Sequence, residues 1–159
     1  MSHPQWLPEL FPVNPWQHDT YEALYRLFER DFKESQPMYE RQAVWFFPEM
    51  EDGKEKIFWH LTSRKDKRAG DRLPDLRRSE RLPWVRPMLD CPGKPGALAW
   101  DHREGDGTVK TYIWLEKDDF VVIMKKYPDG QRRLITSFWV EYGNAKRKLR
   151  KKYERRIGA

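Results

Sequence analysis

The chain has 159 residues, a net charge of +6, 35% charged residues and one cysteine, Cys91. This length suits a single domain with its own core, and one cysteine excludes both an internal disulfide and a cysteine cluster that binds metal. No apolar run approaches the roughly 20 residues that span a bilayer, and the N-terminus lacks the charged and apolar regions of a signal peptide. We therefore expect a soluble, cytoplasmic protein with no membrane partner.

The N-terminal region predicts an arm followed by an amphipathic helix. Residues 1–18 contain four prolines and favour an extended segment over a helix. We expect this arm to pack through three aromatic side chains, Trp6, Phe11 and Trp16. Aromatic and leucine residues then recur at helical spacing over residues 20–34, with Asp19 and Glu22 placed as in a capping box.

The rest of the chain predicts strands and a closing helix. Residues 43–47 and 56–61 flank the turn-prone MEDGKE and predict a hairpin, and the Pro-rich stretch 62–95 suggests one helical turn. Four more β-like runs alternate with turns at GDG, KDD and PDG; they are 97–102, 109–116, 120–126 and 132–141. The last three should form an antiparallel meander. Asn144 is placed to cap a helix that ends near Arg156.

Together these elements predict an α+β fold with an N-terminal helix, a curved antiparallel sheet of about four strands and a basic C-terminal helix. We expect one domain over residues 1–159. Its parts are the arm 1–18, the helix and hairpin 19–56, and a core 57–156.

Motifs of most cofactor-dependent enzymes are absent. The chain has no Walker-type glycine loop, dinucleotide fingerprint, GxSxG elbow or HExxH pair. Its four histidines are scattered without metal-ligand spacing: His3, His18, His60 and His102. We therefore expect neither a metal site nor a cofactor.

Positive charge is concentrated in two blocks. Nine Lys/Arg against four Asp/Glu lie between His60 and Met88, and eight against one lie between Tyr142 and Ala159. Such clustering is typical of a surface that binds a polyanion, while a merely solvated surface is the plainer interpretation. As RNA-binding side chains we predict Arg64, Arg77, Trp84, Arg86, Lys146, Arg147, Arg150 and Lys151.

The segment RRSERLPWVR places four arginines around one tryptophan, Trp84. They are Arg77, Arg78, Arg81 and Arg86. Arginine binds phosphate oxygens bidentately, and a neighbouring tryptophan can stack on a base. Ion pairs with Asp75 and Glu80 would explain one or two of these arginines, but not four beside a tryptophan.

Two polar residues interrupt runs that would otherwise be core. In FWHLTSR we expect His60 at a strand end, on the face of Phe58, and in LITSFWV we expect Thr136 on the face of Leu134 and Phe138. A histidine that closes a strand is more often structural than catalytic, and a strand threonine is easily satisfied locally. Both interpretations therefore stay open on the residues alone.

These side chains suit metal-free cleavage of RNA, in which the 2′-hydroxyl attacks the adjacent phosphorus. The protein then supplies a base that works near pH 7, an acid for the leaving oxygen and cations for the charge of the phosphorane. Histidine, with a pKa of about 6.5, is the natural base, and arginine is the natural cation. A threonine hydroxyl can hold a phosphate oxygen.

The order of these motifs resembles the barnase–EndoU–colicin–RelE (BECR) superfamily of toxin nucleases, in its phage- and mobile-element-associated branches. The resemblance covers about residues 57–156. Its matching pieces are FWHLTSR, RRSERLPWVRPML, KTYIWLEKDDFVVIMKK and RRLITSFWVEYGNAKRKLRKKYE.

The resemblance implies a nuclease-like core in which helices precede a four-stranded antiparallel sheet. It also implies a metal-independent endoribonuclease of toxin type that acts by 2′-hydroxyl transesterification. The catalytic residues it implies are His60, Arg78, Arg81 and Thr136, and we add Lys110 and Tyr112 as supporting groups. The expected partners are RNA, with tRNA as one candidate, and an inhibitory antitoxin or immunity protein.

Two other functions stay open. The first is a catalytically silent module that binds nucleic acid through the same basic surfaces. The second is an interaction protein of a mobile element, whose aromatic arm docks a partner and whose basic helix is incidental. Only the nuclease requires His60 for turnover, and only the interaction protein predicts little salt-sensitive binding of RNA.

Overall fold

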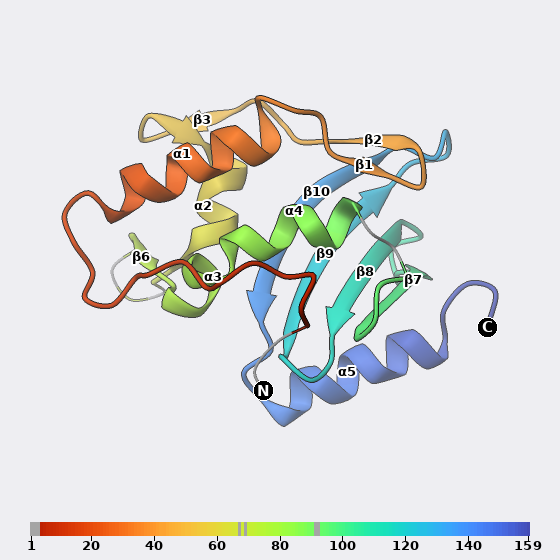
Figure 1. The fold of residues 1–159 in the computed structure, drawn as a ribbon. Coiled ribbons are helices and arrows are strands. Elements are labelled where there is room, and N and C mark those ends of the chain that lie inside the picture. Colours follow the sequence, from red (N-terminus) through yellow and green to blue (C-terminus); the bar gives the residue numbers. More distant parts are fainter. Residues whose placement is uncertain (1–3, 67, 69, 91–92) are drawn as a thin grey trace.

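The computed structural model describes residues 4–66, 68, 70–90 and 93–159, so Cys91 and His3 lie outside the described residues (Figure 1). Within them the fold is α+β, as predicted. The helices are α1 Thr20–Phe32, α2 Lys56–Thr62, α3 Leu76–Glu80, α4 Leu82–Asp90 and α5 Gly143–Glu154. None of the helices in these ranges has the length and apolar content needed to cross a membrane.

A six-stranded sheet with the order β1-β2-β10-β9-β8-β7 forms the centre of the fold. Its strands are β1 Met38–Tyr39, β2 Gln42–Trp45, β7 Ala97–Arg103, β8 Val109–Leu115, β9 Phe120–Lys126 and β10 Arg132–Trp139. Strands β7 to β10 form an antiparallel meander, which confirms the strands predicted between the three turns. The prediction of about four strands was too low. Strand β2 pairs with β10 in parallel over a short stretch, and no turn in the sequence connects these two strands.

Alternating side chains divide the sheet between two apolar clusters. One face packs with α1, α2 and α4, and its buried residues include Phe28, Phe58 and Trp84. The other face packs with α5 through Leu149, with Ala145 and Tyr153 beside it. Figure 1 shows α4 lying across the sheet and α5 running along the ends of its strands. The apolar residues of α5 therefore fix the basic helix to the sheet.

The arm packs on the fold as predicted. Trp6, Phe11 and Trp16 are partly buried against the main core, and Leu7 is 5% exposed. The backbone amide of Phe11 donates to Glu80 O at 2.8 Å. The arm is therefore held against the junction of α3 and α4.

The prediction for residues 56–61 was wrong, because this segment is helix α2 and not a strand. Its buried residues are Ile57, Phe58, Leu61 and Thr62, a spacing that fits one face of a helix. Seven residues of mixed apolar character do not distinguish a strand from a buried helix by periodicity. The predicted hairpin with residues 43–47 is replaced by a small one, β3 Met50–Glu51 with β4 Lys54–Glu55.

Residues 62–95 contain more structure than the single helical turn predicted. Strands β5 Ser63–Lys65 and β6 Arg72–Pro74 pair with each other, and helices α3 and α4 follow. Two prolines make α4 difficult to predict from the sequence. Pro83 is the second residue of the helix, where its missing N–H costs nothing, and Pro87 interrupts the helix interior.

The two predicted helix caps differ in outcome. Asp19 occupies the N-cap of α1 without a side-chain hydrogen bond, and Thr20 Oγ1 instead accepts from Gln17 N at 2.8 Å. Helix α5 begins at Gly143, so Asn144 lies inside its first turn and accepts a hydrogen bond from Arg147. The N-cap position predicted for Asp19 is therefore confirmed without its capping bond, whereas the cap predicted at Asn144 was wrong.

A β-bulge in β10 changes which way Thr136 faces. The register against β9 shifts between Leu134 and Thr136, so Leu134 pairs with Met124 and Thr136 pairs with Ile123. Leu134 belongs to the main core, whereas Phe138 packs with the α5 cluster. The prediction that Leu134 and Thr136 share a face was wrong, because the bulge adds one residue to the alternation.

Arg132 is a buried cation at one end of the main core face, with 2% exposure. Its Nε donates to Thr111 Oγ1 at 2.7 Å, and its Nη2 lies 2.9 Å from Glu40 Oε1 and 3.5 Å from Asp101 Oδ2. The guanidinium also lies 4.5 Å from the ring centroid of Tyr39. These contacts fasten the β1–β2 hairpin to β7, β8 and β10.

Candidate active site

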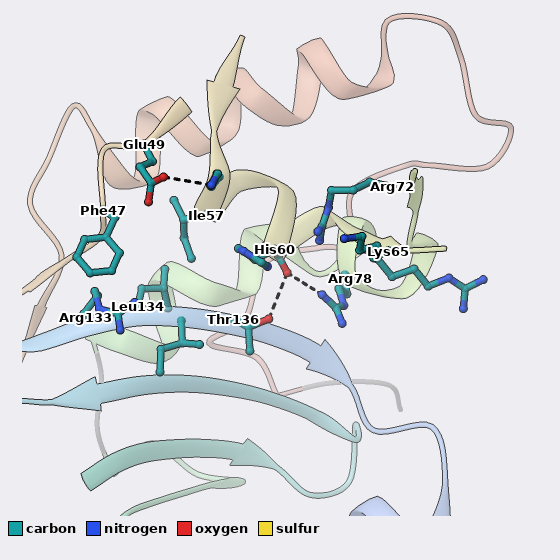
Figure 2. A pocket seen from close by; sticks show the side chains of 13 residues that line it. Phe47, Glu49, Ile57, His60, Lys65, Arg72, Arg78, Arg133, Leu134 and Thr136 are labelled. Carbon is teal, nitrogen blue, oxygen red and sulfur yellow. Dashed lines mark hydrogen bonds and ion pairs between the residues drawn. The ribbon is translucent and has the colours of Figure 1, made fainter. Parts of the chain in front are cut away.

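A pocket of about 610 Å³ lies between α2 and the exposed edge of β10 (Figure 2). Its lining includes His60 and Thr136, one carboxylate, Glu49, and six cations. The cations are Lys56, Arg64, Lys65, Arg72, Arg78 and Arg133. Such an excess of positive charge in a concave site favours an anionic ligand.

Helix α2 places His60 at the pocket. Phe58, Leu61 and Thr62 are buried on the other side of the helix, which leaves His60 exposed. Its carbonyl oxygen accepts from Arg78 Nη1 at 2.8 Å and from Thr136 Oγ1 at 3.3 Å, as Figure 2 shows. These bonds are made to the backbone of α2 and not to the imidazole ring. They bring together three of the four predicted catalytic residues, His60, Arg78 and Thr136.

The C-terminal end of α2 explains why arginines gather here. Arg72 Nη2 donates to Trp59 O at 3.2 Å, and Arg78 Nη1 donates to Ser63 O at 3.0 Å. Free carbonyl groups at a helix C-terminus attract cations. Arg72 and Arg78 thus have a structural role, and the same contacts hold their charge at the pocket.

The charge of Arg78 is further shaped by its surroundings. Burial and the neighbouring cations Arg72 and Arg64 lower the pKa of its guanidinium below its usual value, while Asp75 raises it. Asp75 Oδ2 lies 3.3 Å from Arg78 Nε. Arg78 thus pairs with one carboxylate while two further arginines lie near enough to affect its charge.

The pocket also lowers the pKa of His60 below its usual value of 6.5. Partial loss of solvent around the ring is the main cause, and the positive charges of Arg72 and Arg78 act in the same direction. The ring is therefore neutral at pH 7, although one side of it stays open to solvent. A neutral imidazole is the form that can accept a proton.

We predict that His60 titrates below pH 6.5 in the folded protein, because desolvation and two arginines disfavour the charged ring. Since the unfolded chain binds this proton more readily, the contribution of His60 to stability is complete above pH 6.5 and falls as the pH drops below it. Nuclear magnetic resonance of the ring protons would measure the midpoint. Arg72→Gln should raise it, whereas Arg77→Gln should not.

Arg81 and Trp84 of the arginine segment do not line the pocket. Arg81 lies at the C-cap of α3, where its Nη1 contacts Glu80 Oε1 at 2.6 Å and its guanidinium lies over the ring of Trp84. Trp84 is 1% exposed, and its Nε1 donates to Pro8 O at 2.8 Å. The prediction that a base stacks on Trp84 was therefore wrong, because neither face of the ring is open.

The supporting residues Lys110 and Tyr112 lie in a different place. They line a smaller pocket of about 250 Å³ against α5, which shares no described lining residue with the pocket at His60. Tyr112 is 2% exposed, its hydroxyl donates to Glu104 Oε2 at 2.9 Å, and burial raises its pKa to about 12. Neither residue can therefore act as a proton-transfer group beside His60.

The predicted RNA-binding residues also lie in different parts of the structure. Arg64 lines the main pocket, and Arg77 lies 5.0 Å from the ring centroid of Trp139 in an adjacent one. Arg86 is committed to the fold, because it contacts Asp90 at 2.9 Å and tethers α4 to the end of α1. On α5, Lys146 and Arg150 pair with Asp119 and Glu116, while Arg147 and Lys151 are exposed; these last two stay available for RNA.

Several pocket residues were missed in the sequence. Arg72 and Arg133 come from β6 and β10, and Lys56, Lys65 and Glu49 come from segments without a motif. Glu49 Oε2 accepts from Lys56 Nζ at 3.1 Å. The one signal that could have found part of this set is the basic block itself, which contains Lys65 and Arg72.

The described residues contain no group of three or more His, Cys, Asp or Glu that could hold a metal ion. No protein-family model matches the chain, and neither a curated protein nor a solved structure matches it. The functional assignment therefore depends on the pocket itself.

Proposed function

We propose that the chain is a metal-independent endoribonuclease of toxin type that cuts RNA by 2′-hydroxyl transesterification. The observation that supports this most is the meeting of a neutral, exposed His60 with six cations in one pocket. The resemblance of the FWHLTSR, RRSER and LITSFWV segments to BECR nucleases points the same way. We also propose a cytoplasmic location and an inhibitory partner protein, as that class requires.

In the proposed reaction, His60 takes the proton of the 2′-hydroxyl while the 2′-oxygen attacks phosphorus. The P–O5′ bond then breaks, the leaving oxygen gains a proton, and a 2′,3′-cyclic phosphate forms. Arg72 and Arg78 face the negative charge of the phosphorane. Thr136 Oγ1, 3.3 Å from His60 O, can turn toward a phosphate oxygen.

The second proton transfer needs a group other than Lys110 or Tyr112. Glu49 is the one carboxylate among the described lining residues of the pocket. It accepts a hydrogen bond from Lys56, which is one of the six lining cations. We assign the ammonium group of Lys56 to donate the proton to the 5′-oxygen, and the carboxylate of Glu49 to hold Lys56 in place. Arg81 keeps only a structural role in the proposal, because its contacts lie at the α3–α4 junction.

The test is incubation of the purified protein with an RNA pool and with DNA of matched sequence, both in EDTA. The proposal predicts discrete RNA fragments and intact DNA, because DNA lacks the 2′-hydroxyl that supplies the nucleophile. Fragmentation of both, or loss of RNA cleavage in EDTA, would contradict transesterification without metal.

A silent nucleic-acid-binding module remains the second candidate. It is favoured by the carbonyl contacts of Arg72 and Arg78, which give both arginines a structural reason to be present. This function predicts intact RNA together with binding that weakens steeply as salt rises. The same incubation, followed by a binding titration at two salt concentrations, separates the two functions.

A further inference from the structure

The sheet face opposite Arg132 carries one row of directly paired residues from five strands. The row consists of Trp45, Arg133, Lys125, Lys110 and His102. Residues paired directly across strands point to the same face, and adjacent strands lie about 4.8 Å apart. Three cations from neighbouring strands therefore stand side by side in the middle of the row.

This arrangement costs stability unless something neutralises it, because like charges directly opposite each other repel. In the described part of the chain none of the three cations forms an ion pair with a carboxylate; Arg133 and Lys125 lie over the rings of Phe47 and Tyr127 instead, at 4.2 and 5.1 Å. On the other face of the sheet, by contrast, the neighbouring cations are paired with a carboxylate. There Lys126 and Arg132 are neutralised by Asp101, with Lys126 Nζ 3.0 Å from its Oδ2.

Aromatic rings lie beside two of the three cations, Arg133 and Lys125. The rings of Trp45 and Phe47 have centroids 5.5 Å apart, and those of Trp45 and Tyr127 are 5.4 Å apart. Phe47 is 47% exposed. Interleaved rings and cations are how proteins hold single-stranded nucleic acid, since bases stack on the rings and phosphates meet the cations.

This surface joins the pocket at His60. Phe47 and Arg133 line that pocket, and Figure 2 shows both at the end away from Arg72 and Lys65. Lys125 and Tyr127 line a second pocket, whose lining also includes Arg103 and the carboxylate Asp101. A strand that leaves the first pocket past Arg133 would thus meet Lys125 on the next strand of the sheet.

We propose that this face binds single-stranded RNA that runs out of the pocket at His60. Bases stack on Phe47 and Trp45, and Arg133, Lys125 and Lys110 contact successive phosphates. A duplex cannot use this surface in the same way, because its bases are already stacked and paired. The identity of the ligand as RNA rests on the proposed function, whereas the binding itself does not require cleavage.

The test measures fluorescence anisotropy of a labelled 12-nucleotide oligouridine and of a 12-base-pair RNA duplex, in EDTA. All proteins carry His60→Ala, so the RNA stays intact. Phe47→Ala should weaken single-strand binding at least about fivefold, the lower limit for one stacked base. Lys125→Ala should reduce the salt slope of binding by about 1.

Matched controls are Tyr142→Ala and Lys117→Ala, which remove an exposed ring and an exposed lysine elsewhere. Their binding should equal that of the parent, and circular dichroism checks that each variant folds. Equal affinity for the duplex, or variants that behave as their controls, would overturn the inference.

The outcomes also separate this inference from the nuclease proposal. Cleavage by the wild type with unchanged binding in Phe47→Ala and Lys125→Ala contradicts only the binding surface. Binding that depends on both residues, without cleavage by the wild type, supports the surface and contradicts only the nuclease. No binding together with no cleavage by the wild type contradicts both.

Discussion

Replacing His60 by alanine should reduce cleavage of RNA by about 10²- to 10⁴-fold, the range for loss of a general acid or base. The side chain is exposed on α2, and alanine is a strong helix former. The variant should therefore fold and still bind RNA. The measurement is the single-turnover rate at pH 7 beside the dissociation constant.

The control for this variant is His18→Ala, because His18 is an exposed histidine in the arm, away from the pocket. Its rate should equal that of the wild type. The pH profile provides a second readout, since the acidic limb of the wild type should follow the titration of His60 and lie below pH 6.5. A full rate for His60→Ala would remove His60 from the reaction.

Replacing Arg132 by alanine should destabilise the fold by about 3–5 kcal/mol, the usual cost of breaking a buried ion pair from one side. Thr111 and Asp101 would lose a donor inside the fold, and Tyr39 would lose the guanidinium that covers its ring. For a chain of this size the melting temperature should fall by roughly 6–20 °C. Thermal unfolding followed by circular dichroism measures the change.

Arg26→Ala is the matched control for Arg132, because Arg26 is exposed on α1 and alanine suits a helix. Its free energy of unfolding should change by less than about 0.5 kcal/mol. Because Arg132 also fastens the hairpin that carries Trp45, its loss should weaken single-strand binding at a temperature where the variant is still folded. Similar melting of the two variants would contradict the structural role of Arg132.

The parts of the fold that the sequence predicted correctly have local causes. Strands β7 to β10 are separated by Asp- and Gly-rich turns, and α1 and α5 have apolar residues at helical spacing. The parts that were missed depend on distant partners. Helix α2 is a helix because its apolar side meets α1 and the sheet, and β2 is a sheet strand because Val44 and Trp45 meet β10.

The candidate site was predicted in part for the same reason. His60, Arg78 and Thr136 do meet, although His60 comes from a helix and not from a strand end. Arg81 follows Arg78 by three residues, yet α3 ends between them and turns Arg81 toward Trp84. The cations Arg72 and Arg133 enter from other strands, and no spacing in the sequence places them beside His60.

The most direct measurement is the chemistry of the new RNA ends after incubation in EDTA, in wild type and His60→Ala side by side. Transesterification leaves a 2′,3′-cyclic phosphate on one fragment and a 5′-hydroxyl on the other. The proposal predicts both ends in the wild-type reaction and their near absence with His60→Ala. Fragments that carry 5′-phosphate ends, or RNA that stays intact with the wild type, would contradict it.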